Sequence, residues 1–133
     1  MLSGLILIVI GSVLGGCARY FISGVIARRL GETFPWGTMT INVTGAFLIG
    51  IVGALATHPG SSFASSDALS NPWLFAVTGF LGCYTTVSSF SLQTLTLANS
   101  GERRRAIGNI VLSVSLCLAA VSVGFTLADS WGG

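Results

Sequence analysis

The sequence predicts an all-α membrane protein with four transmembrane helices, the third of them broken at its centre. The chain has 133 residues, of which 52% are hydrophobic and only 8% are charged, whereas soluble domains carry about 25% charged residues. Four nearly uncharged stretches each exceed the roughly 20 residues that cross a bilayer. The third stretch has glycine, serine and threonine at its middle, which predicts the break. We therefore expect residues 1–133 to form a single four-helix domain embedded in a lipid bilayer.

Composition also excludes several functions. There is no extended basic run, no zinc-ligand spacing and no alternation of aromatic and basic residues, so no nucleic-acid partner is expected. His58 is the only histidine and has no cysteine or carboxylate cluster near it. No nucleophile–base pair is visible either, so we expect no enzyme. Cys17, Cys83 and Cys117 all lie in apolar stretches, where thiols act as small apolar side chains.

The first stretch covers residues 2–27 and contains one charge, Arg19. Gly11 and Gly15 are four residues apart, a spacing that lets two helix backbones approach closely. Arg19 lies beside Tyr20, a residue type suited to the membrane interface. The guanidinium either extends to that interface or helps to draw anions into a vestibule, and the sequence leaves both possibilities open.

The second stretch covers residues 36–57. Pro35 precedes it, and proline starts a helix well because its missing N–H needs no partner there. Asn42 belongs to a face of otherwise small residues that repeats every four positions: Asn42, Ala46, Gly50 and Ala54. Its amide either hydrogen-bonds another helix or presents a donor to a pore, and the spacing does not distinguish the two.

The third stretch covers residues 73–98 and carries no charge. Glycines and β-branched threonines at its centre predict a break, and a break frees carbonyls from their helical donors. Several such carbonyls at one point can bind a hard cation without any carboxylate. Beyond the break, one helical face collects three polar residues and a phenylalanine: Thr86, Ser89, Phe90 and Gln93. Such a membrane segment is a candidate pore or ion site.

The fourth stretch covers residues 106–128 and follows the basic loop 102–105. A polar track repeats every four residues along one of its faces: Asn109, Ser113 and Cys117. With four spans, every arginine lies in or near the two loops on one side of the membrane: Arg19, Arg28, Arg29, Arg103, Arg104 and Arg105. The positive-inside rule therefore places these loops in the cytoplasm and both termini outside.

The chain resembles the Fluc/CrcB family of small fluoride channels along its whole length. The resemblance rests on three motifs, one in each of the first three stretches. They are Gly15-Gly16 with Arg19-Tyr20, then Phe34-Pro35-Trp36-Gly37-Thr38 with Asn42 and Gly45, and then Thr78-Gly79-Phe80-Leu81-Gly82 leading to Thr85-Thr86 and Ser88-Ser89-Phe90-Ser91. The second and third motifs together are specific, and we do not expect both by chance in a four-span chain.

The resemblance implies an antiparallel dimer with two pores in the bacterial inner membrane. Fluoride would leave the cytoplasm passively through these pores, which lowers the toxicity of fluoride inside the cell. It also implies a structural sodium ion, not itself transported, held by backbone carbonyls that match Gly82 and Thr85. Arg19 is expected at a vestibule or in a structural role. The expected fluoride path combines matched positions with the polar faces described above: Asn42, Thr86, Ser89, Phe90, Asn109 and Ser113.

Two positions depart from the family pattern. Val87 stands where the first of two pore phenylalanines is usual, and valine lacks the positive ring edge that can meet an anion. Asn109 stands where a tyrosine is usual. A chain that inserts in both orientations should show little arginine asymmetry, yet the asymmetry here is strong. Two assemblies therefore remain possible from the sequence. One is a homodimer, and the other is a heterodimer with an oppositely oriented paralogue, in which this chain is a half-pore or non-conducting subunit.

The placement of charge also separates a channel from an exporter. The chain has no lysine and no acidic residue inside a predicted span. Uncharged hydrogen-bond donors can replace the water around fluoride and still release the ion. A small four-span multidrug exporter, the other alternative, should need an acidic residue within a helix to bind a proton or a cation.

Overall fold

The structure is a computed structural model that describes residues 2–31, 33–58, 61–63 and 70–132. Its elements are α1 (Leu2–Leu30), α2 (Trp36–Thr57), α3 (Asn71–Trp73), η1 (Leu74–Leu81), α4 (Gly82–Tyr84), α5 (Val87–Asn99) and α6 (Arg103–Gly132). Four helical segments are long and apolar enough to cross a membrane: Leu2–Leu30, Trp36–Thr57, Asn71–Asn99 and Arg103–Trp131. The predicted fold class, four membrane-spanning helices with the third one broken, is confirmed.

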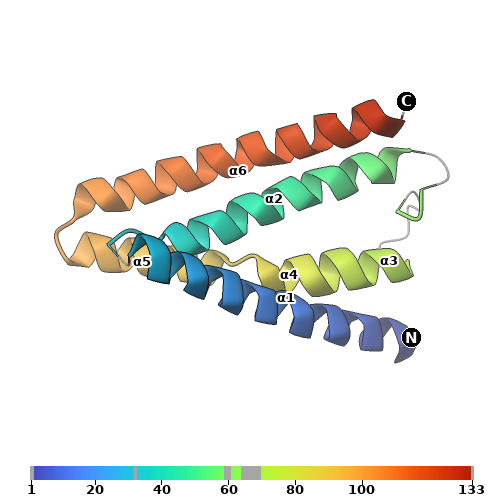
Figure 1. The fold of residues 1–133 in the computed structure, drawn as a ribbon, viewed down its shortest axis with the longest axis horizontal. Coiled ribbons are helices and arrows are strands. Elements are labelled where there is room, and N and C mark those ends of the chain that lie inside the picture. Colours follow the sequence, from blue (N-terminus) through green and yellow to red (C-terminus); the bar gives the residue numbers. More distant parts are fainter. Residues whose placement is uncertain (1, 32, 59–60, 64–69, 133) are drawn as a thin grey trace.

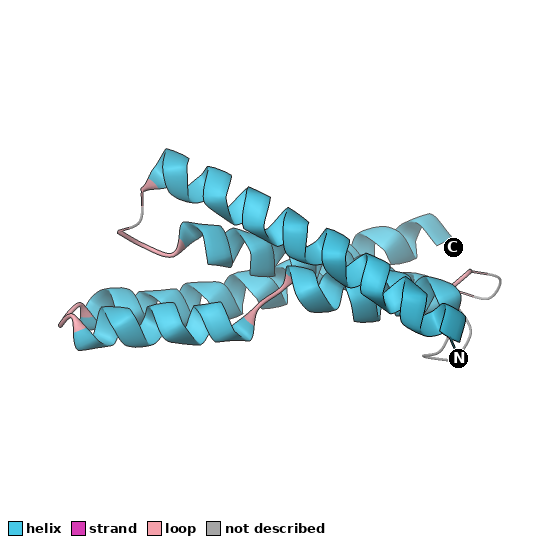
Figure 2. Ribbon diagram, turned by 90° about the horizontal axis from the view of Figure 1, so that it is seen from below, coloured by secondary structure: helices cyan, strands magenta, loops and turns pink. Residues whose placement is uncertain are grey.

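The four spans run along the long axis of the molecule (Figure 1). Helix α2 packs along α6, and α1 packs along η1. Both termini lie at one end of the bundle, and the α1–α2 and α5–α6 connections lie at the other. The arginines that end α1 and begin α6 therefore share one end of the molecule. Figure 2 shows the non-helical link between α4 and α5 as a loop midway along the third span.

Two glycines end helices at the arginine-rich end. Gly31, after α1, has φ +79° and Gly101, after α5, has φ +82°, a left-handed conformation that glycine adopts at no steric cost. The N–H of Glu102 then donates to the carbonyl of Leu97 at 2.9 Å, which closes the last turn of α5. Helices α1 and α6 both extend beyond the predicted apolar stretches because arginine is a good helix former.

Glycines also form the closest contacts between helices. A Cβ on Gly11 would overlap the carbonyl oxygen of Phe75, and one on Gly15 would overlap the carbonyl oxygen of Phe80. Helices α1 and η1 therefore pack backbone against backbone, and the predicted close approach at these two glycines is confirmed. Two further glycines do the same between α2 and α6: Gly50 and Gly124.

The first half of the third span is not an ordinary α-helix. Element η1 is a π-helix of eight residues, and the short α4 follows it. The chain then leaves the helical conformation at Thr85, with ψ 159°, and at Thr86, with ψ 122°. Long π-helices are rare and are often found at functional sites. The sequence does not predict this π-helix, because an apolar run has the same composition in either kind of helix.

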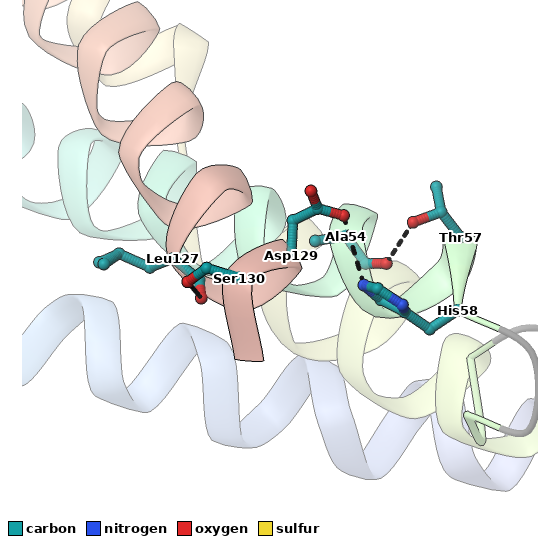
Figure 3. A network of polar contacts seen from close by, with 6 residues as sticks. All are labelled: Ala54, Thr57, His58, Leu127, Asp129 and Ser130. Carbon is teal, nitrogen blue, oxygen red and sulfur yellow. Dashed lines mark hydrogen bonds and ion pairs between the residues drawn. The ribbon is translucent and has the colours of Figure 1, made fainter. Parts of the chain in front are cut away.

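The ends of α2 and α6 meet beside the C-terminus (Figure 3). His58 Nε2 lies 3.3 Å from Asp129 Oδ1, close enough for an ion pair when the imidazole is protonated. The hydroxyls of Thr57 and Ser130 instead donate to carbonyls in their own helices. This contact therefore joins the C-terminal ends of α2 and α6, two helices that already pack together along their length.

We expect Asp129→Asn to change the free energy of unfolding by less than about 1 kcal/mol, because water screens the charge of a carboxylate that is more than half exposed. The Asp129 side chain is 56% exposed. Thermal unfolding in detergent at pH 6 and pH 8 measures the effect, with Ser130→Ala as a neighbouring control. A large loss of stability confined to pH 6 and to Asp129→Asn would contradict this expectation.

Candidate functional site

Asn42 holds the break in the third span open. Its Oδ1 accepts the Thr86 N–H at 2.8 Å, and its Nδ2 donates to the Thr86 carbonyl at 2.9 Å. One side chain of α2 thus satisfies both backbone groups of a residue that has left the helix. Unpaired backbone groups cost several kcal/mol each in hydrocarbon, so this amide makes a non-helical residue tolerable here. The interhelical hydrogen bond left open by the sequence is the arrangement observed.

Thr86 in turn caps α5. Its Oγ1 accepts the N–H of Ser89 at 3.2 Å and donates to Ser89 Oγ at 3.3 Å, the pattern of an N-cap residue. In an uninterrupted α-helix the N–H groups of Thr86 and Ser89 would bond to the carbonyls of Gly82 and Thr85. Both N–H groups are bound elsewhere, so these two carbonyls are released from their helical donors.

A cavity of about 550 Å³ lies between α2, the broken third span and α6. Its lining is mostly apolar. Four residues of the path expected from the sequence line it, namely Asn42, Thr86, Phe90 and Ser113. Gly82 and Thr85 line it as well. A single space is therefore surrounded by the backbone freed at the break, the amide of Asn42, the ring of Phe90 and the α6 hydroxyl of Ser113.

Asn109 lies beside this cavity rather than in its lining. The residue is only 1% exposed, and its Nδ2 donates to Thr94 Oγ1 at 2.8 Å. Thr94 donates to the carbonyl of Phe90 at 2.7 Å, and Ser113 Oγ donates to Asn109 Oδ1 at 3.4 Å. Asn109 thus connects α5 to α6 and orients the hydroxyl of Ser113, which does line the cavity.

Two further residues expected at the site lie outside the lining of this cavity. Ser89 belongs to the cap of α5 formed with Thr86. Arg19 is on α1, which contributes no lining residue. Within the described part of the chain, Arg19 makes no side-chain hydrogen bond or ion pair.

Several residues that support the site were missed by reasoning from the sequence. Thr94 carries the link between Asn109 and α5, and Tyr84 bonds to Thr44 on α2 at 2.8 Å. Gly45 lies against Thr85 so closely that a Cβ would overlap the threonine side chain. Only Gly45 carried a signal in the sequence, since it belongs to the second motif of the family resemblance.

A second cavity, of about 470 Å³, is formed by the last turns of α1, the start of α2 and the middle of α5. Its polar lining residues are Ser23, Thr38, Gln93 and Thr96. The Oε1 atom of Gln93 is buried without a hydrogen-bond partner among the described residues. This cavity therefore has both the room and a free polar atom for water or a ligand. Gln93 belongs to the polar face that the sequence predicts beyond the break.

The chemistry available at the first cavity suits a small anion. No residue that lines it carries a charge. The Asn42 amide has a second N–H beyond the one bound to Thr86, and the edge of a phenyl ring is weakly positive. Among the described residues there is no group of three or more histidine, cysteine, aspartate or glutamate side chains that could hold a metal ion. A cation there would depend on backbone carbonyls.

Comparison with known proteins agrees with this arrangement. The family model described as "CrcB-like protein, Camphor Resistance (CrcB)" matches residues 6–125. The chain is 80% identical over 133 residues, which cover 100% of it and 94% of the relative, to "Fluoride-specific ion channel FluC 2" of Bradyrhizobium diazoefficiens. It is 58% identical over 128 residues, 96% of the chain and 95% of the relative, to the protein of the same name from Rhodopseudomonas palustris.

A more distant relative still matches most of the chain. The chain is 47% identical over 120 residues to "Fluoride-specific ion channel FluC 3" of Brucella suis biovar 1, which covers 90% of this chain and 87% of the relative. The range matched by the family model, residues 6–125, includes most of all four spans, the break and the residues that line the first cavity. The family resemblance drawn from the sequence motifs is confirmed, and this chain belongs to the CrcB family.

Proposed function

We propose that this chain is a subunit of a fluoride channel that lets fluoride leave the cytoplasm passively, and that it is not an enzyme. One observation carries the proposal: uncharged donor groups gather around a cavity beside a break in an otherwise apolar span. The choice of ion is supported by the relatives of this chain, which are named as fluoride-specific ion channels. An inside-negative potential drives an anion outward with about 2.3 kcal/mol per 100 mV.

Fluoride passes by exchanging its water for weak donors one after another. The second N–H of the Asn42 amide and the edge of Phe90 can each replace one water without holding the ion tightly. The hydroxyls of Thr86 and Ser113 can do the same only when they turn away from Ser89 and Asn109, to which they donate in this structure. Ser89 contributes through the cap of α5, and Asn109 contributes by fixing Ser113. A charged group would bind the ion more strongly and slow its release.

A structural sodium ion fits the backbone of the break. The carbonyls of Gly82 and Thr85 are freed because Asn42 and Thr86 take their helical donors, and carbonyl oxygens are suitable ligands for a hard cation. Sodium would be held there as a fixed positive charge that is not transported. Since two carbonyls alone make an incomplete ligand set, we propose that a second subunit supplies the rest.

The channel is proposed to be an antiparallel dimer in the bacterial inner membrane, with the arginine-rich end in the cytoplasm. Val87 is 77% exposed at the rim of the cavity in the single chain, where a second subunit would cover it. The strong arginine asymmetry and the valine at this place favour an oppositely oriented paralogue as the partner over a second copy. The numerals in the names of the relatives fit organisms that have several such chains.

Fluoride efflux from liposomes that contain only this chain tests the function and the pairing together. The heterodimer predicts little flux from the chain alone and restored flux when the paralogue is added, whereas a homodimer predicts flux from the chain alone. No fluoride flux under either condition, with protein shown to be inserted, would reject the channel. Proton-driven export of a cationic drug by the same liposomes would instead favour the multidrug exporter.

We expect Phe90→Ile to reduce fluoride efflux at least tenfold in whichever assembly conducts. Isoleucine keeps a large apolar side chain, although a smaller one, and loses the positive ring edge, an interaction of about 0.5–1.5 kcal/mol between rings and more with an anion in a low dielectric. Leu92→Ile, on the exposed side of α5, is the control and should leave the flux unchanged. Equal flux from both variants would remove Phe90 from the path.

A further inference from the structure

We propose that Tyr84 and Thr44 form a positioning pair that holds the freed carbonyls of the break in place before a cation binds. The inference rests on the sodium site of the proposed function. Tyr84 is the last helical residue before the break and is only 5% exposed. Its hydroxyl lies 2.8 Å from Thr44 Oγ1 on α2, 40 positions away in the sequence.

The direction of this hydrogen bond follows from the other contacts of Thr44. Its hydroxyl also lies 2.8 Å from the carbonyl of Thr40, to which it can only donate. A hydroxyl has a single hydrogen, so while Thr44 donates to a carbonyl of its own helix, Tyr84 is the donor and Thr44 Oγ1 the acceptor. The hydroxyl of Tyr84 therefore donates to Thr44 Oγ1 on α2, while the hydroxyl hydrogen of Thr44 is donated within α2.

The ring of Tyr84 is fixed by packing as well as by its hydroxyl. It stacks on Phe80 with the ring centroids 5.6 Å apart, and it belongs to a buried cluster with Ile41 and Leu81. A side chain held at both its ring and its hydroxyl has little freedom to rotate. The backbone of the residue before Thr85 is therefore tied to α2.

Helix α2 thus holds the chain on both sides of residue 85. Thr44 binds Tyr84 just before it, Asn42 binds Thr86 just after it, and Gly45 leaves room for the side chain of Thr85. Carbonyl oxygens that are directed at one cation site repel each other while that site is empty. Prior fixation lowers the cost of binding, because the ordering has already taken place.

The test compares Tyr84→Phe, Thr44→Val and the double variant with Thr40→Val as the matched control, because the Thr40 hydroxyl donates only to its own helix. The measurement is the rise in melting temperature on titrating sodium chloride against choline chloride, together with amide hydrogen exchange of residues 82–90. We expect the half-maximal sodium concentration to rise two- to fivefold in each single variant, since one hydrogen bond contributes about 1 kcal/mol. The double variant should show no further rise, and exchange in sodium-free buffer should be faster at the break.

Two outcomes would overturn the inference in distinguishable ways. If the variants melt lower in both salts by the same amount and keep the wild-type sodium midpoint, the pair is only structural. If the assembled dimer, with the wild-type form of this chain, gains no stability from sodium over choline, there is no cation site for the pair to position. The liposome assay for fluoride is independent of both results, so the channel itself stands or falls separately.

Discussion

Asn42→Ala should lower fluoride efflux from liposomes by on the order of 100-fold or more. The change leaves both the N–H and the carbonyl of Thr86 without the partners that the amide provides at 2.8 and 2.9 Å. Each buried group so released costs about 1–3 kcal/mol, and each 1.4 kcal/mol is a factor of ten in a population. The open break should therefore become a minor state. In the major state the N–H of Thr86 can return to the carbonyl of Gly82.

Two companion variants separate the role of Asn42 in holding the break from its role in contacting the ion. Val43→Ala removes side-chain volume from the next position of α2 without removing a hydrogen bond, and it should conduct nearly as the wild type. Asn42→Asp keeps the acceptor for the Thr86 N–H but adds a negative charge, so it should protect that amide from exchange and still fail to conduct. Wild-type flux from Asn42→Ala would reject both roles.

Gly15→Ala should destabilise the protein strongly and reduce the amount of folded channel. The added Cβ would overlap the carbonyl oxygen of Phe80, which is main chain and cannot turn aside. Helices α1 and η1 would have to separate, and overpacking of this kind costs about 1–3 kcal/mol or more. Because η1 leads into the break, any stability gained from the proposed sodium site should fall too.

Gly16→Ala is the matched control for this prediction. It is the next residue of the same helix, and a Cβ there would meet no atom within 4 Å. Replacing glycine by alanine inside a helix is worth up to about 1 kcal/mol, so this variant should be neutral or more stable. Thermal unfolding and size-exclusion elution in detergent measure both variants. An equal loss of stability in the two variants would show that the close packing around Gly15 is not the cause of the destabilisation.

The number and the approximate positions of the four spans could be predicted because a membrane span depends on local composition. A helix that crosses hydrocarbon satisfies its backbone within itself, so the run of uncharged residues is enough to identify it. The break followed in the same way, from glycines and threonines at the centre of the third stretch. The π-helix that precedes it could not be predicted, since its composition is that of any apolar helix.

The candidate site was predicted as a set of residues and not as an arrangement. Spacing placed Asn42 on one face of α2 and Ser113 on one face of α6, and both line the cavity. Spacing did not show that the Asn42 amide would be occupied by the backbone of Thr86, or that Asn109 would be buried against Thr94. Those contacts depend on which helices pack together and on how each side chain is turned.

By itself, the sequence determined that the chain lies in a membrane, crosses it four times and interrupts the third crossing, because these properties follow from composition along one segment at a time. Only the tertiary structure decided which groups meet at the interruption. Asn42 reaches Thr86 across 44 positions of sequence and Tyr84 reaches Thr44 across 40. Hydrogen bonds act over about 3 Å, so such pairs are decided by helix packing rather than by spacing along the chain.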